Sequence, residues 1–219
     1  KVMAVQGSSG TESVVVEAYG YVLEMRATYN ETEGEKGAFV VATNSSFGVD
    51  AGQPEDYPIW CALYDSLGMQ GIISAADTAT RNWDIDEVGD VPTACGSDYL
   101  ISVTNTTRYD AKTTNAGYGL ETIDLGAPGS SIYSTYNGSN YGNLSGTSMA
   151  TPQVAGAIAY LFSSADDNFL LNYETYPAEY ALKIKQYIME GVDILPSLEG
   201  VTVSGGRLNL NNSLDLFIN

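Results

Sequence analysis

The sequence predicts an α/β fold, with three layers built around a doubly wound, mostly parallel sheet, in a single domain over residues 1–219. Short apolar runs typical of strands alternate with longer segments of helical periodicity, which is the pattern of successive βαβ units. The chain has 219 residues and is 44% apolar, which is sufficient for one packed core. In such sheets the functional site lies at the carboxyl ends of the strands.

The predicted elements follow one another in a regular order. Strands are expected at residues 1–5, 38–44, 71–77, 99–106 and 122–129, and helices at 14–29, 56–68, 147–162 and 176–191. Ser13 is a candidate cap for the first helix, and Gly68 is expected to end the second. Residues 205–218 predict a strand-like step and a short helix. Because the sequence opens directly on a strand, we expect that an N-terminal portion of the domain is missing.

Charge and cysteine content restrict the possible partners. The formal net charge is −18, which argues against binding nucleic acid, and no apolar run is long enough to span a membrane. Cys61 and Cys95 are too few to form a metal site, because no histidine is present and neither lies in a CxxC pair. They form either one disulfide or two free thiols, and a surface rich in Asn, Ser, Thr and Gly favours a secreted protein with a disulfide.

The stretch GTSMATPQVAG, residues 146–156, has the features of a nucleophile at the start of a helix. Ser148 is expected near unpaired backbone N–H groups, which stabilise a developing anion. Gly146 permits close approach of a substrate backbone, and Pro152 is expected in the first helical turn. An ordinary capping serine gives a similar local pattern. A serine nucleophile also needs a base, and the sequence has no histidine.

This stretch closely resembles the serine signature of the subtilisin-like serine proteases, the subtilases. Other segments resemble the family in the same order: KVMAVQGSSGTES, TNSSFG, GIISAADTATRN, TIDLGAPGSSIYST, SNYGNLSGTSMATP and GGRLNL. The resemblance implies a subtilisin-like fold and a secreted serine endopeptidase. In subtilases the triad runs in the order Asp, His, Ser. The resemblance therefore implies that Asp and His lie on a preceding segment, so that an N-terminal fragment of the same precursor is the expected partner.

The family motifs assign roles to individual residues. Ser148 matches the nucleophile, which forms an acyl-enzyme with a peptide carbonyl. The strand that pairs with an extended peptide substrate matches Ser46, Phe47 and Gly48. The opposite wall of the specificity pocket matches Ala75, Ala76 and Asp77. The family usually has Gly where this chain has Asp77, so a carboxylate is expected to narrow or acidify the pocket.

Two further positions depart from the family pattern. Thr78 matches the position of the asparagine that donates to the oxyanion, and its hydroxyl can also donate one hydrogen bond. Asn82 is the alternative donor if the loop is longer. Gln153 stands where the family typically has His, on the helix beyond the nucleophile, and no catalytic loss is expected from it.

Kexin-like subtilases hold calcium beneath the pocket, and the resemblance makes Asp50 and Asp84 candidate ligands because calcium prefers carboxylate oxygens. Solvated loop acids are the alternative, and Asp86 and Asp90 are weaker candidates. A disulfide between Cys61 and Cys95 is expected to brace the strand before Thr78. No organic cofactor is expected.

Two alternatives remain open at this point. A sedolisin has the same fold and a similar serine motif but uses Glu and Asp in place of His, which suits a histidine-free chain. However, Met149 to Pro152 and the GAPG loop resemble subtilisins more. A pseudoprotease that binds peptides without cleaving them is the other alternative, because half of the triad is absent and Thr78 replaces an asparagine.

Overall fold

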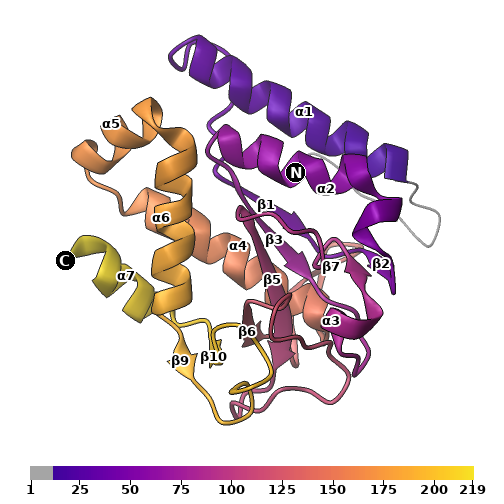
Figure 1. Ribbon diagram of the computed structural model, residues 1–219. Helices are drawn as coiled ribbons and strands as arrows, with labels where there is room; N and C mark the ends of the chain where they lie inside the picture. Colours follow the sequence, from indigo (N-terminus) through magenta and orange to yellow (C-terminus); the bar gives the residue numbers. More distant parts are fainter. Residues whose placement is uncertain (1–11) are drawn as a thin grey trace.

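A six-stranded sheet runs through the centre of the protein in the computed structural model, which describes residues 12–219 (Figure 1). Its order is β1-β3-β5-β6-β10-β9, and every neighbouring pair is parallel except β10 and β9. The strands are β1 (Ala42–Ser45), β3 (Ile73–Asp77), β5 (Leu100–Thr106), β6 (Leu125–Pro128), β9 (Asp193–Ile194) and β10 (Gly206–Arg207). The predicted α/β fold with a mostly parallel sheet is confirmed. The predicted strand at residues 1–5 lies outside the described residues.

Seven α-helices and one short 3₁₀ helix are found in the described part of the chain. They are α1 (Glu12–Glu31), α2 (Pro58–Met69), α3 (Ile85–Val88), α4 (Thr147–Ser163), α5 (Asp167–Thr175), α6 (Pro177–Glu190), α7 (Leu210–Ile218) and η1 (Pro54–Asp56). Five of these were predicted from the sequence, namely α1, α2, α4, α6 and the short helix α7 near the end of the chain. The helix α5 was missed, although Asp166 caps it by accepting a hydrogen bond from the Phe169 N–H at 2.7 Å.

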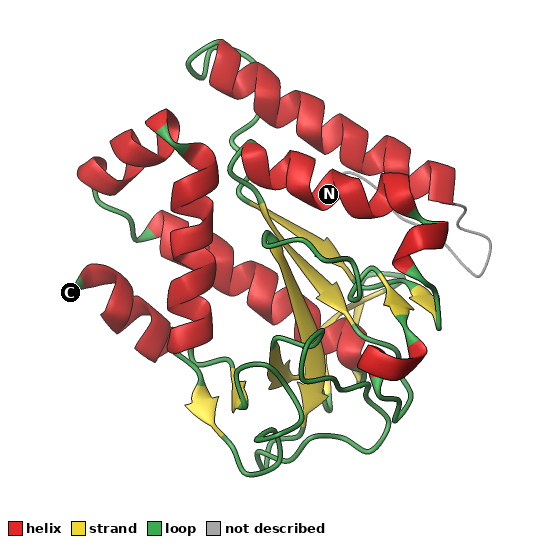
Figure 2. Cartoon of the chain, viewed as in Figure 1, coloured by secondary structure: helices red, strands yellow, loops and turns green. Residues whose placement is uncertain are grey.

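Alternate residues of each central strand enter different cores. Ile73, Ala75 and Ile101 pack against α4 and α6, whereas Ile72 and Leu100 pack against α1 and α2. This period of two gives a sheet with helices on both faces. Figure 1 shows α1 and α2 lying together on one side, and Figure 2 shows the long strand arrows pointing the same way. The loops that follow these strands therefore gather at one edge.

The helix α2 does not end at Gly68 as predicted. It runs to Met69, and Gly71, with φ +94°, makes the turn into β3. Gly68 has a packing role instead, because a Cβ added there would lie 1.9 Å from the ring of Tyr99. A glycine does follow the end of the helix, but the residue in the left-handed conformation is Gly71 and not Gly68.

A disulfide joins Cys61 in α2 to Cys95, which follows β4 (Asp90–Val91). The predicted pairing is confirmed. The bridge attaches the helix before β3 to the segment after it, across a sequence separation of 34 residues. A crosslink of this span restricts the unfolded chain substantially.

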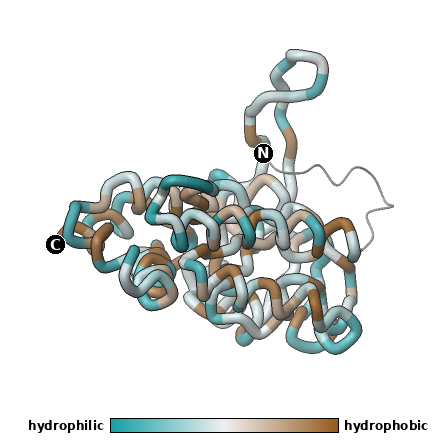
Figure 3. The backbone as a smooth tube through the Cα atoms, turned by 90° about the horizontal axis from the view of Figure 1, so that it is seen from above, coloured by the Kyte–Doolittle hydropathy of each residue, from teal (hydrophilic) through white to brown (hydrophobic). Residues whose placement is uncertain are grey.

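Two small antiparallel pairs lie outside the main sheet. One joins β2 (Val49–Asp50) to β4, and the other is the hairpin of β7 (Ile132–Tyr136) and β8 (Asn140–Leu144). The hairpin stands out from the body of the protein in the view of Figure 3. Its residues are mostly exposed, and the rings of Tyr133 and Tyr141 stack across it at 5.8 Å. Among the described residues, no helix is long and apolar enough to cross a membrane.

Candidate active site

The second residue of α4, Ser148, lies at the edge where the parallel strands end. The helix begins at Thr147 after Gly146, so the Ser148 N–H is one of the amides without a partner inside the helix. The side chain is partly exposed, as a nucleophile must be. Its Oγ donates a hydrogen bond to Asp77 Oδ2 at 2.7 Å, and Asp77 is the last residue of β3.

The predicted position of Pro152 in the first turn of the helix is wrong. Pro152 lies in the second turn of α4, where it cannot donate to the Ser148 carbonyl, four residues before it. That carbonyl instead accepts a hydrogen bond from Ser46 Oγ at 2.9 Å. Ser46 directly follows β1, so the proline leaves a free acceptor that connects the nucleophile to the predicted substrate strand.

A small pocket of about 90 Å³ surrounds these groups. It contains most of the residues that the sequence predicted for chemistry and binding, namely Ser46, Phe47, Gly48, Asp50, Asp77, Thr78 and Ser148. Asp90, a weaker calcium candidate, also lines the pocket, and two further lining residues, Ala79 and Thr80, were not predicted. Thr80 Oγ1 lies 3.3 Å from Thr147 Oγ1, next to the nucleophile.

Ala75 and Ala76 do not line this pocket. Both are fully buried, Ala75 in the core beneath α4 and Ala76 in the core beneath α1 and α2. As inner residues of β3 they position Asp77, and their side chains point into the two cores of the protein.

The structure places Asp77, and not Thr78, in hydrogen-bond contact with Ser148. The Thr78 hydroxyl is buried without a hydrogen-bond partner, and it lies beside Gly117, where a Cβ would come within 2.4 Å of it. Asn82, the alternative donor, is exposed, lies outside the pocket and accepts a hydrogen bond from Lys112 Nζ at 3.2 Å. The role of Thr78 as oxyanion donor stays a prediction, since neither of these contacts involves an oxyanion.

Asp50 and Asp84, the predicted calcium ligands, are engaged separately. Asp50 pairs with Arg81 at 3.1 Å, and Asp84 caps α3 by accepting from the Asp86 N–H at 3.2 Å. No group of three or more His, Cys, Asp or Glu side chains that could hold a metal ion occurs among the described residues. Asp50 and Asp84 each have a separate partner, and calcium binding at these carboxylates stays a prediction.

Asp90 was only a weak calcium candidate in the sequence, but it proves to be a buried member of the pocket. Its Oδ2 accepts hydrogen bonds from the Ala79 N–H at 3.1 Å and from Thr93 Oγ1 at 2.6 Å. Burial, followed by the charge of Asp77, raises the pKa of Asp90 to about 7. An acidic residue in a loop of many acids gave no sign in the sequence that it would be buried.

This raised pKa predicts the pH dependence of stability. Because the pKa of Asp90 is higher in the folded protein than the ordinary value of 3.8, the native state binds a proton that the unfolded chain releases, and the free energy of unfolding falls as pH rises from about 4 to 7. The free energy of unfolding of Asp90→Asn relative to wild type should therefore increase over this range, by about 1.4 kcal/mol per pH unit. Urea unfolding at several pH values, with Asp56→Asn as an exposed control, measures it. A constant difference would contradict the raised pKa.

Gln153, at the position where the family typically has His, donates to the Pro128 carbonyl at 2.6 Å. This hydrogen bond connects α4 to the end of β6. Its role is therefore structural in this conformation.

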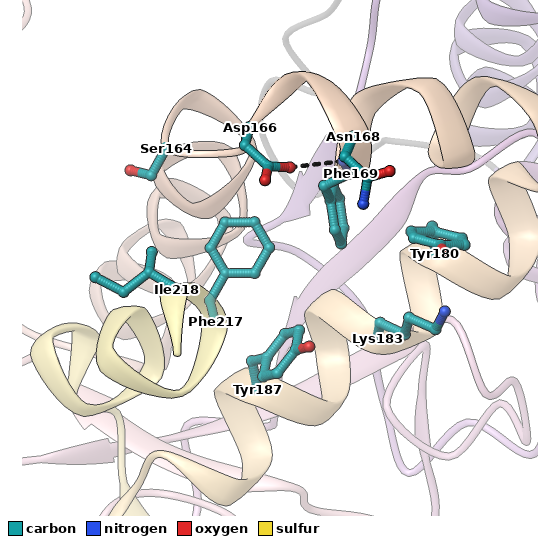
Figure 4. A pocket seen from close by; sticks show the side chains of 9 residues that line it. All are labelled: Ser164, Asp166, Asn168, Phe169, Tyr180, Lys183, Tyr187, Phe217 and Ile218. Carbon is teal, nitrogen blue, oxygen red and sulfur yellow. Dashed lines mark hydrogen bonds between the residues drawn. The ribbon is translucent and has the colours of Figure 1, made fainter.

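A second, larger pocket of about 410 Å³ lies among α5, α6 and α7. Figure 4 shows the rings of Phe169, Tyr187 and Phe217 turned toward one another there. Lys183 Nζ lies 3.6 Å from the centre of the Tyr180 ring and pairs with Glu179. The pocket shares no lining residue with that of Ser148, so the chemistry expected of the serine belongs to the smaller pocket.

A sequence model of a protein family, described as the subtilase family, matches residues 3–208. The chain belongs to the subtilase family. Thermitase from Thermoactinomyces vulgaris is 52% identical over 63 residues, which cover 29% of this chain and 22% of thermitase. An intracellular serine protease of Paenibacillus polymyxa is 34% identical over 152 residues, which cover 68% of this subtilase and 44% of that protein.

Solved structures support the subtilisin-like fold. The self-cleaved protease domain of PatA matches with a TM-score of 0.72 at 20% identity, covering 95% of this subtilase and 68% of that chain. The prenylagaramide maturation protease PagA matches with a TM-score of 0.70 at 18% identity, covering 99% and 71%. The subtilase spans less than half the length of the two curated relatives described above.

Proposed function

We propose that this chain carries the nucleophile of a secreted subtilisin-like serine endopeptidase, which hydrolyses peptide bonds through an acyl-enzyme on Ser148. The observation that carries the proposal is the place of Ser148. It lies at the start of α4, in a pocket at the carboxyl edge of a parallel sheet, with an unpartnered amide beside its hydroxyl. Membership of the subtilase family supports the same chemistry.

The base for this reaction comes from outside these residues. Because the 219 residues contain no histidine, we propose that the triad Asp and His lie on a preceding segment of the same precursor. That segment takes the Ser148 proton when Oγ attacks the peptide carbonyl carbon. It returns the proton to the leaving amine when the C–N bond breaks.

The substrate is proposed to be an extended peptide. Ser46, Phe47 and Gly48 follow β1 and line the pocket, so a peptide can add to this edge as a further strand. The hydrogen bond from Ser46 to the Ser148 carbonyl fixes the edge relative to the nucleophile. Secretion is supported by the disulfide between Cys61 and Cys95, because such bonds persist in oxidising compartments.

Labelling with a fluorophosphonate tests the proposal. In the full-length protein we expect one equivalent of label on Ser148, located by peptide mass spectrometry, because phosphonylation requires an activated hydroxyl. The 219-residue chain alone should not react. Ser148→Ala should abolish labelling, and Ser163→Ala, on the last turn of the same helix, should not. An unlabelled Ser148 in a folded full-length protein would contradict the protease and favour the peptide-binding pseudoprotease.

A further inference from the structure

The Ser148 pocket has a carboxyl group directly beside the attacking oxygen. Asp77 Oδ2 lies 2.7 Å from Ser148 Oγ and 3.5 Å from Thr147 Oγ1. Ser148 is the second residue of α4, so its N–H has no partner within the helix. The attacking oxygen therefore lies close to two groups, a backbone amide of its own residue and the carboxyl of Asp77.

The charge of this carboxyl decides what it does during the reaction. When Ser148 Oγ bonds to the carbonyl carbon, the π electrons of the C=O bond move to its oxygen, and the serine proton passes to the triad base. The resulting oxyanion needs hydrogen-bond donors. An ionised carboxylate can only accept, so it repels the oxyanion. A protonated carboxyl has an O–H to donate.

The surroundings of Asp77 favour the protonated form. The residue is 8% exposed, and the same pocket contains Asp90, which is 2% exposed, and Asp50. Arg81 pairs with Asp50. No ion pair among the described residues involves Asp77 or Asp90.

Three effects act on Asp77, and burial is the largest of them. Burial and, to a smaller extent, the charge of Asp50 raise the pKa of Asp77 to about 6, against the opposing hydrogen bonds from Ser148 and Thr147. Asp90, on β4, lines the same pocket, and burial followed by the charge of Asp77 raises its pKa to about 7. Three carboxyl groups around one small pocket thus disfavour ionisation of the innermost ones.

We propose that Asp77 is a catalytic residue that acts in its protonated form, donating to the oxyanion beside the Ser148 N–H, so that ionisation of Asp77 switches catalysis off. The Asp77 proton stays on its carboxyl throughout. The serine proton travels by way of the triad base to the leaving amine. This inference rests on the proposed endopeptidase function and adds a requirement for mildly acidic conditions. The charge of Asp50 helps to hold the proton on Asp77, so Asp50 acts as a positioning residue.

The test is the pH profile of kcat/KM, from pH 4 to 9, for the full-length protein and its Asp77→Asn variant on a peptide substrate. Asn has nearly the same shape as Asp and carries a donor at every pH. The wild type should lose activity about tenfold per pH unit above the Asp77 pKa of about 6. The variant should lack this descending limb and exceed the wild type by about 100-fold at pH 8.

Controls separate this inference from its alternatives. Asp56→Asn, an exposed aspartate on η1, should keep the wild-type profile. Equal profiles for wild type and Asp77→Asn would overturn the proposal while leaving the protease intact. A folded Asp77→Asn protein that is inactive at every pH would also overturn it, because Asp77 would then be a base. Absence of cleavage and of fluorophosphonate labelling in both proteins would overturn the proposed function and this inference with it.

Discussion

Replacing Ser148 with alanine is expected to reduce kcat/KM of the full-length protein by on the order of 10⁶-fold, the size of the kcat loss that subtilisin shows when its nucleophile is removed. The hydroxyl is the only group in the Ser148 side chain that can bond to a peptide carbon. No other serine of the described chain combines a place at the start of a helix with the pocket at the sheet edge.

The fold should tolerate this change. Ser148 is only partly buried, and its loss removes one hydrogen bond to Asp77, so unfolding free energy should change by about 1 kcal/mol or less. Turnover of a fluorogenic peptide and thermal unfolding together measure both effects. Ser163→Ala serves as the matched control on the same helix. Activity within tenfold of the wild type would show that Ser148 is not the nucleophile.

The second large effect is expected from Gly129→Ala, at the turn after β6. A Cβ at Gly129 would lie 2.4 Å from the Gly146 carbonyl oxygen and 2.5 Å from Asn105 Oδ1. The Gly129 carbonyl also accepts the Gly146 N–H at 2.9 Å. Since Gly146 is the N-cap residue of α4, the added methyl group displaces the start of the helix and with it Ser148.

We expect Gly129→Ala to lower stability by about 1–3 kcal/mol through overpacking. A displacement of about 1 Å at the nucleophile should also reduce kcat/KM by about 100-fold. The control is Gly156→Ala in the middle of α4, where no atom lies within 4 Å of the added Cβ and helix propensity improves by about 1 kcal/mol. Peptide turnover and urea unfolding measure both variants. Wild-type activity and stability for Gly129→Ala would contradict the tight contact.

Local patterns predicted the elements that depend on periodicity. The strands that contain Ile73 and Ile101, and the helix that begins at Thr147, follow from apolar runs and helix signals that the sequence displays directly. The hairpin β7–β8 was not predicted, because its exposed tyrosines and polar residues show no alternation of apolar and polar positions.

The burial of Arg26 was not predicted either. The residue is fully buried, with its guanidinium carbon 4.4 Å from the centre of the Phe39 ring and 5.0 Å from that of Tyr173.

The site was predictable to the extent that family motifs fix positions along the chain. Ser148 and the Ser46 to Gly48 segment meet as expected, because both flank the carboxyl edge of the sheet. The hydrogen bond between Asp77 and Ser148 was not predicted from the sequence. A strand end can be matched to a motif with an error of one residue, and one residue turns a side chain to the opposite face. The burial of Asp90 depends on the pairing of β2 with β4, which is a long-range contact.

The proline in α4 has a mechanical consequence. Because Pro152 has no N–H, one hydrogen bond of the helix is missing and the Ser148 carbonyl is left without its helical donor. Ser46 Oγ donates to that carbonyl instead. The end of the first strand and the nucleophile are thereby joined by a single hydrogen bond across 102 residues of sequence. Under the proposed function, a peptide laid along that strand end is aligned with the nucleophile through this hydrogen bond. Pro152, which frees the carbonyl for it, does not itself line the pocket.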